Sequence, residues 1–105
     1  MRIIETSIFT KRINKLLTDE EYRSIQNELI INPEKGKIIR GSGALRKIRS
    51  GISERGKSGG VRIIYYWIIK KDVILMILAY PKNEQDNLTP SQLKILKSLV
   101  EKELQ

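Results

Sequence analysis

The chain has 105 residues, of which 40% are hydrophobic, and its 20 Lys and Arg outnumber 12 Asp and Glu to give a net charge of +8. This length and apolar content fit one folded domain, residues 1–105, and exclude both a second domain and a disordered chain. Cys and His are absent, which excludes disulfides, thiolate or imidazole metal ligands and a histidine base, so we expect neither a metal nor a cofactor.

The N-terminal part of the chain predicts a short strand and two helices. The opening Met-Arg-Ile-Ile-Glu lacks the apolar core of a secretory signal, and no later apolar run approaches the roughly 20 residues of a spanning helix, so we expect a cytoplasmic protein without membrane contact. Two isoleucines predict a strand over 2–5, after which Thr6 or Ser7 can cap a helix with apolar residues at helical spacing. Thr18 with Glu21 three residues later is a capping-box pattern that starts a second helix, and an Asn-Pro pair ends it.

From residue 36 onward, glycines and β-branched residues replace the helical pattern. Strands are predicted over 45–50, 61–69 and 73–80, and a short turn joins the last two into a hairpin. Apolar residues occupy both faces of 61–69, which is typical of a central strand.

A final helix is predicted after a polar loop. Thr89 is its cap, Pro90 takes the first helical position, and Gln92 completes a capping box. The fold class is therefore α+β: an N-terminal strand, a two-helix hairpin, a small and mainly antiparallel sheet, and a C-terminal helix. We expect the helices to pack on one face of the sheet and the other face to be polar.

The positive charge is concentrated in the middle of the sequence. From Lys35 to Lys71 there are 11 Lys and Arg and one Glu, a net charge of +10, which leaves −2 for the remainder. Closely spaced cations repel one another unless a polyanion relieves them, so this segment indicates a phosphate-binding surface. A solvated basic face that keeps the protein in solution is the simpler alternative, and charge alone does not separate the two.

Four cations are predicted to meet on the polar face of the sheet. Side chains alternate along the strand predicted over 45–50, which puts Lys47 and Arg49 on one face of the sheet and Arg46 on the other. A hairpin with the strand over 61–69 brings Arg62 beside that pair. Lys82 follows the end of the strand over 73–80. Such a cluster can bind a phosphodiester and stabilise the added negative charge of a pentacoordinate transition state.

Metal-free RNA cleavage also needs one group to take the 2′-OH proton and another to protonate the leaving oxygen. Without His, the candidates are a Lys whose pKa is lowered by neighbouring cations, a Tyr, or a carboxylate such as Glu84. Tyr65, Tyr66 and Tyr80 are candidates for the acid or for platforms on which bases stack. The alternative for each tyrosine is a place in the core, where most aromatic side chains of central strands are found.

Three segments share an order and spacing with a known family. They are the Gly-x-Gly-x-Leu-Arg-Lys-Ile-Arg run of 41–49, the Gly-Lys-Ser-Gly-Gly-Val-Arg-Ile-Ile-Tyr-Tyr run of 56–66, and the Tyr-Pro-Lys-Asn-Glu corner of 80–84. Together with the chain length they resemble the RelE/HigB group of toxins from bacterial type II toxin–antitoxin modules. The likeness is closest to the HigB-like branch and covers nearly the whole chain.

The resemblance implies a ribosome-dependent mRNA endoribonuclease, an mRNA interferase, that inhibits translation by cutting mRNA in the ribosomal A site through 2′-OH attack without a metal. It implies ribosome and mRNA as partners, and a cognate antitoxin, expected to be of the helix-turn-helix type and encoded in an adjacent gene. Operator DNA would be contacted only through the complex with the antitoxin.

Carried over by position, the resemblance places the catalytic groups at Lys47, Arg49, Arg62 and Lys82. Lys47 or Lys82 is expected to transfer protons, and the two arginines are expected to bind phosphate. Further RNA contacts are predicted for Arg46, Arg55, Lys57, Tyr65, Tyr80 and Asn83.

One position departs from the family pattern. Some members place a Tyr or His shortly after the last strand, whereas here no aromatic residue follows Tyr80. Tyr80, Asn83 and Glu84 are the alternatives for that role. Two other functions use the same basic face: a non-catalytic RNA- or DNA-binding module, and an inactive toxin-like protein that serves as an antitoxin partner or co-repressor.

Overall fold

The computed structural model describes residues 1–50, 60–85 and 87–104. Its elements follow the predicted order, with one short additional strand before the main sheet strands. In chain order they are β1 (Arg2–Glu5), α1 (Ser7–Leu16), α2 (Asp19–Ile31), β2 (Lys37–Ile38), β3 (Arg46–Ser50), β4 (Val61–Ile68), the 3₁₀ turn η1 (Ile69–Lys71), β5 (Val73–Pro81) and α3 (Pro90–Leu104).

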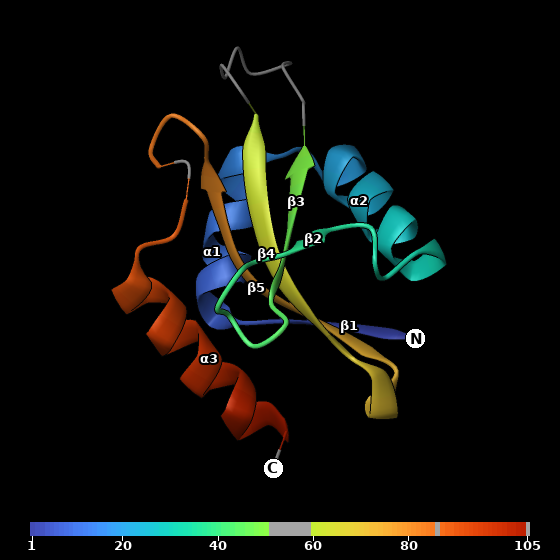
Figure 1. The fold of residues 1–105 in the computed structure, drawn as a ribbon. Helices are drawn as coiled ribbons and strands as arrows, with labels where there is room; N and C mark the ends of the chain where they lie inside the picture. Colours follow the sequence, from blue (N-terminus) through green and yellow to red (C-terminus); the bar gives the residue numbers. More distant parts are fainter. Residues whose placement is uncertain (51–59, 86, 105) are drawn as a thin grey trace.

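The strands form one five-stranded sheet in the order β1-β5-β4-β3-β2 (Figure 1). All neighbours are antiparallel except β1, which runs parallel to β5. The α+β class and the mainly antiparallel sheet are therefore confirmed. The two-residue strand β2 was not predicted, because a segment that short has no readable alternation.

Side-chain caps begin all three helices where the sequence predicts them. The Thr6 hydroxyl accepts a hydrogen bond from the Phe9 amide at 3.1 Å. Thr18 and Glu21 form a reciprocal capping box at the start of α2. At α3, the amide of Gln92 donates to the Thr89 hydroxyl, while the Gln92 side chain accepts from the Thr89 amide. Each cap satisfies amides that a helix leaves without intrahelical acceptors.

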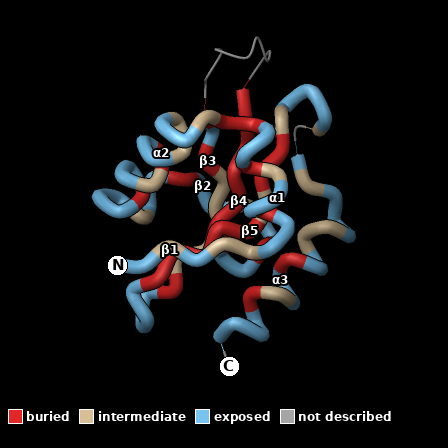
Figure 2. Tube along the Cα trace, turned by 180° about the vertical axis from the view of Figure 1, so that it is seen from behind, coloured by how far each residue is buried: buried red, intermediate tan, exposed pale blue. Residues whose placement is uncertain are grey.

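Helices cover both faces of the sheet, so the prediction that all of them pack on one face is wrong. Buried residues of α1 and α2 form one core cluster with Ile63 and Tyr65 of β4. Leu96 and Val100 of α3 form a second cluster with Ile64, the residue between those two on the strand. Figures 1 and 2 show α3 on one side of the sheet and the α1–α2 pair on the other. The apolar residues on both faces of β4 require this double cover.

Within the described residues, no helix is both long and apolar enough to cross a membrane. The same part of the chain holds no group of three or more His, Cys, Asp or Glu side chains placed to bind a metal ion.

Tyr65 connects the first core cluster to the segment between α2 and β2. Its hydroxyl donates to the Pro33 carbonyl at 2.7 Å and accepts from the Gly36 amide at 2.8 Å. A Cβ on Gly36 would lie 2.8 Å from the Tyr65 hydroxyl and ring, so only glycine permits this close approach. Burial raises the pKa of the Tyr65 phenol above its usual value.

We expect Tyr65→Phe to lower the free energy of unfolding by about 1–3 kcal/mol, because the buried Gly36 amide loses its hydrogen-bond partner. Urea unfolding measures this change. Tyr66→Phe is the matched control, since Tyr66 lies on the opposite face of the same strand and is half-buried; it should shift the free energy by no more than about 0.5 kcal/mol. Equal losses in both variants would contradict the role given to the Tyr65 hydroxyl.

Candidate active site

The strand register places three of the predicted cations on one face of the sheet. Arg49 of β3 is directly opposite Arg62 of β4, and Arg62 is directly opposite Tyr80 of β5. Lys47 lies two residues before Arg49 and therefore on the same face. Two arginines facing each other across neighbouring strands repel, and a bound anion relieves that repulsion.

Arg62 differs from its neighbours in being buried. Its side chain is only 3% exposed, whereas Arg49 is exposed and Lys47 is half-buried. A guanidinium held in a low-dielectric position acts more strongly on a nearby charge than the same group in water. Because β4 is the central strand, paired on both sides, the backbone beneath Arg62 is fixed before any ligand arrives.

Lys47 contacts a residue that the sequence did not single out. Its ammonium donates to the side-chain oxygen of Asn87 at 3.0 Å. The Gln85 amide group donates to the Asn87 carbonyl at 2.9 Å and exchanges hydrogen bonds with the side chain of Gln92. The start of α3 thereby holds the loop against β3. Nothing in the sequence marks Asn87, because the contact joins positions 40 residues apart.

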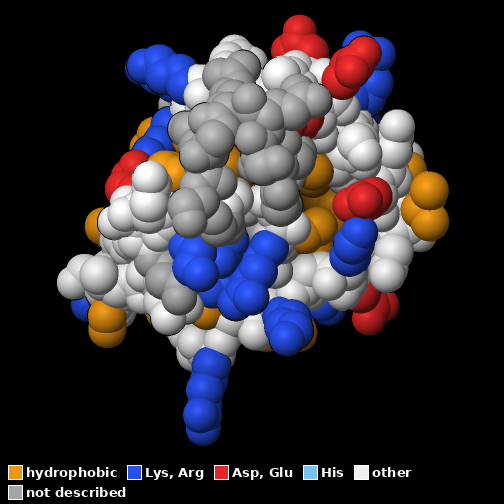
Figure 3. All heavy atoms as spheres, turned by 90° about the horizontal axis from the view of Figure 1, so that it is seen from above, with side chains coloured by type: hydrophobic (Ala, Val, Ile, Leu, Met, Phe, Trp, Pro, Cys, Tyr) orange, Lys and Arg blue, Asp and Glu red, His pale blue; other side chains and the backbone are white. Residues whose placement is uncertain are grey.

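Lysine and arginine side chains gather at the end of the sheet where β4 begins (Figure 3). A hollow of about 400 Å³ lies in this region. Four cations line it together with Asn87 and apolar side chains; the cations are Lys37, Arg40, Lys47 and Arg49.

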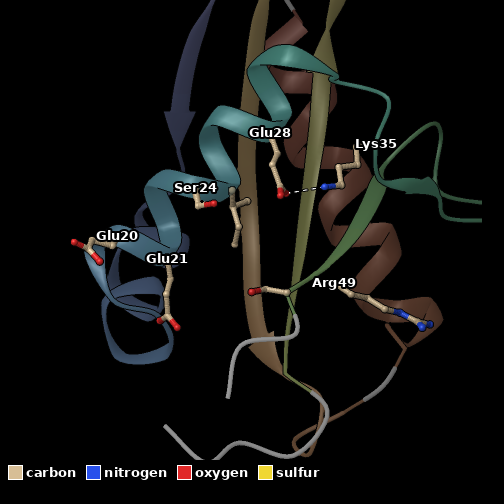
Figure 4. A pocket seen from close by; sticks show the side chains of 8 residues that line it. Glu20, Glu21, Ser24, Glu28, Lys35 and Arg49 are labelled. Carbon is tan, nitrogen blue, oxygen red and sulfur yellow. Dashed lines mark ion pairs between the residues drawn. The ribbon is translucent and has the colours of Figure 1, made fainter. Parts of the chain in front are cut away.

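A second hollow, of about 460 Å³, lies between α2 and β3 and has the opposite character. Glu20, Glu21 and Glu28 line it, and Glu28 forms an ion pair with Lys35 at 2.8 Å (Figure 4). The guanidinium of Arg49 points away from this hollow. Anion binding is therefore favoured on the α3 side of the sheet and disfavoured on the α2 side.

Both tyrosines predicted to contact RNA lie in the core, which corrects that prediction. Tyr65 is fully buried and its hydroxyl is bonded to the backbone. Tyr80 is 1% exposed and packs in the cluster that α3 covers. Neither ring presents a surface on which a base can stack. For Tyr80 the sequence left this alternative open, because its burial depends on α3 crossing this face.

Arg46 is also placed differently from its predicted role. Its guanidinium donates to the carbonyls of Glu34 at 3.2 Å and Gly36 at 2.8 Å. It lies on the opposite face from Lys47 and holds the chain that leads into β2. These contacts give Arg46 a structural role, and its predicted RNA contact stays a prediction.

The corner after β5 presents Lys82 and Asn83 to solvent. The Lys82 amide donates to the Gly60 carbonyl at 3.0 Å, which ties the corner to the beginning of β4. The Glu84 carboxylate lies 2.7 Å from the Arg12 guanidinium of α1, so it is engaged by a cation outside the cluster. Arg55 and Lys57 lie outside the described residues.

Comparison with known proteins places the chain in a family. All of it, residues 1–105, matches the family described as the RelE toxin of the RelE/RelB toxin–antitoxin system. Its fold is similar to that of a chain in the intact E. coli RelBE toxin–antitoxin complex, with 23% identity and a TM-score of 0.60 over 75% of this chain and 93% of that one.

Two further structures are similar to it. One is a doubly substituted mutant of E. coli RelE in the free state, with 23% identity and a TM-score of 0.60 over 80% of this chain and 85% of that one. The other is the isolated E. coli RelE toxin, with 21% identity and a TM-score of 0.59 over 92% and 96%. These similarities show the fold, and the match over the whole length shows the family: the chain belongs to the RelE family of toxins.

Proposed function

We propose that this RelE-family toxin is a ribosome-dependent mRNA endoribonuclease that cuts mRNA in the ribosomal A site by metal-free attack of the 2′-OH. The observation that carries the proposal is the register that sets Arg49 opposite Arg62, with Lys47 on the same face. Such a row of cations is suited to a phosphodiester whose negative charge grows during the reaction.

In this reaction the 2′ oxygen forms a bond to phosphorus while the bond from phosphorus to the 5′ oxygen breaks. Arg49 and Arg62 bind the phosphate oxygens and stabilise the pentacoordinate transition state. A base takes the 2′-OH proton, and an acid supplies a proton to the leaving 5′ oxygen. We assign proton transfer to Lys47 or Lys82. Cleavage leaves a 2′,3′-cyclic phosphate and a 5′-OH, so atoms and charges balance without a co-reactant.

We further propose that a cognate antitoxin, of the helix-turn-helix type and encoded in an adjacent gene, neutralises the protein. The proposal is supported by the family, described as the toxin of a toxin–antitoxin system, and by the similar E. coli toxin in the RelBE complex. Operator DNA would then be bound only by the complex. Co-expression of the neighbouring gene should restore growth and allow both chains to be purified together.

Mapping of mRNA 5′ ends after induction tests the proposed activity. Growth should stop, and new 5′ ends should appear within translated regions. In a purified system, cleavage should require ribosomes as well as mRNA. RNA binding without new ends, at levels that stop growth, would instead favour a non-catalytic nucleic-acid-binding module.

Asn87 is expected to position Lys47 during this reaction. Asn87→Ala should lower the cleavage rate about three- to tenfold, the equivalent of one exposed hydrogen bond. Asn87→Asp adds a carboxylate beside the ammonium, which favours its charged form and should move the Lys47-dependent limb of the pH–rate profile to higher pH. If Lys47 transfers the proton and the pH–rate profile of Asn87→Asp nevertheless does not move, the positioning role of Asn87 is contradicted.

A further inference from the structure

A third hollow adjoins the cationic site and extends it along α3. It measures about 420 Å³ and lies between α3 and the turn that follows β2, where Lys94 and Lys97 face it. It shares Arg40 and Leu93 with the hollow at Lys47 and Arg49. The two hollows are therefore neighbours, and we call the one lined by Arg40, Leu93, Lys94 and Lys97 the α3 groove.

Hydrogen bonds and two glycines fix the turn after β2, which forms one side of the groove. Ser42 is 1% exposed; its hydroxyl donates to the Ile39 carbonyl and accepts from the Leu45 amide at 3.0 Å. Gly41 and Gly43 take positive φ angles of 74° and 71°, which glycine adopts without strain. This turn fixes the segment that carries Arg40 opposite α3.

The positive charges of Arg40, Lys94 and Lys97 exceed the negative charge of the acidic side chains that line the groove. Within the part of the chain that the structure describes, Glu101 is the one acidic side chain that lines it. Among the described residues, the ion pairs are those of Arg12, Lys35 and the N-terminus, and none includes Arg40, Lys94 or Lys97. All three of those cations are exposed. Their mutual repulsion favours a ligand with repeated negative charges.

Apolar side chains line both hollows: Leu93 lies in the α3 groove, and Ile39 and Leu88 lie beside it in the neighbouring hollow. Single-stranded nucleic acids bind where cations follow the backbone and apolar or aromatic surface receives the bases. We propose that the α3 groove binds the single-stranded RNA that flanks the cleaved phosphate, with Arg40, Lys94 and Lys97 contacting its phosphates. This inference rests on the proposed function, because that function places the cleaved phosphate at Arg49 and Arg62.

Charge reversal on α3 tests the groove. Lys94→Glu/Lys97→Glu is compared with Lys11→Glu/Arg23→Glu, which makes the same change in net charge at exposed positions of α1 and α2. The probe is a short fluorescent 2′-O-methyl RNA, which has no attacking hydroxyl and so reports binding without cleavage. Affinity is measured by anisotropy over a series of salt concentrations, after thermal melts have shown that both variants are folded.

The α3 variant should lose at least about tenfold in affinity, and the slope of log K against log salt should fall by about 1.4, the value for two lost phosphate contacts on a single strand. The control should keep its slope and change affinity by less than about threefold. Equal losses in both variants, or no loss in either, would overturn the proposed groove. An α3 variant that binds RNA normally and loses only its binding to the antitoxin would overturn it as well. Groove-dependent binding by a protein that never cuts mRNA would overturn the proposed function and leave the groove standing.

Discussion

Replacing Arg62 with alanine is expected to reduce ribosome-dependent mRNA cleavage at least about 100-fold and to abolish the growth arrest. The guanidinium is buried on the central strand and faces Arg49, so its charge is fixed where the proposed reaction develops negative charge. Removal of one such preorganised donor costs about 100- to 1000-fold in rate in well-studied enzymes. The measurement is the rate of cleavage on programmed ribosomes, with toxicity on induction as the cellular readout.

Arg23→Ala is the matched control, because Arg23 is an exposed arginine on α2 and should leave the rate unchanged. Thermal melts are needed, since Arg62 is buried and its truncation can lower stability. Arg62→Lys keeps the positive charge and loses the planar donor pair, so it should recover part of the rate. A folded Arg62→Ala protein with full toxicity would refute the placement of the site.

Lys47→Ala is expected to lower the cleavage rate by about 100-fold or more, the range for a lost proton-transfer group. Lys47 is half-buried on the face that holds both arginines and is held by Asn87. Lys82, in contrast, lies exposed at the corner beyond β5. Lys82→Ala should therefore have the smaller effect of the two lysine substitutions.

Lys47→Arg separates charge from proton transfer. Arginine retains the positive charge but stays protonated at every accessible pH. The variant should bind the RNA as tightly as the unmodified protein and still cleave slowly, with one limb missing from its pH–rate profile. Wild-type rates in Lys47→Arg would show that Lys47 acts only as a cation and would move the proton transfer to Lys82.

The sequence predicted the elements well because each carries its own local signal. Thr18 with Glu21, and Thr89 with Gln92, identify helix starts from residues three apart, and the structure contains both caps. The alternation Lys47-Ile48-Arg49 likewise requires only the strand period. Placing Arg62 beside Arg49 needed one further assumption, a hairpin, which β3 and β4 form.

The errors arose where contacts between distant residues decide the outcome. Tyr80 follows the strand pattern, but α3 lies over it and removes its ring from the surface. The structural contacts of Arg46 were missed rather than mispredicted, because its guanidinium reaches carbonyls ten and twelve residues earlier in the chain, a distance over which no periodicity operates. Asn87 was missed for the same reason, since its partner Lys47 lies on a strand formed much earlier in the chain.

The parallel pairing of β1 with β5 affects how the protein is made. The Thr6 hydroxyl donates to the Ile77 carbonyl, 71 positions later, so the first strand has no sheet partner until most of the chain has been synthesised. At about 5–20 residues per second, this delay is about 4–14 seconds. A growing chain therefore cannot complete the sheet that supports the cationic row while much of β5 is still inside the ribosome. Translation itself thus sets the earliest moment at which this toxin can become active.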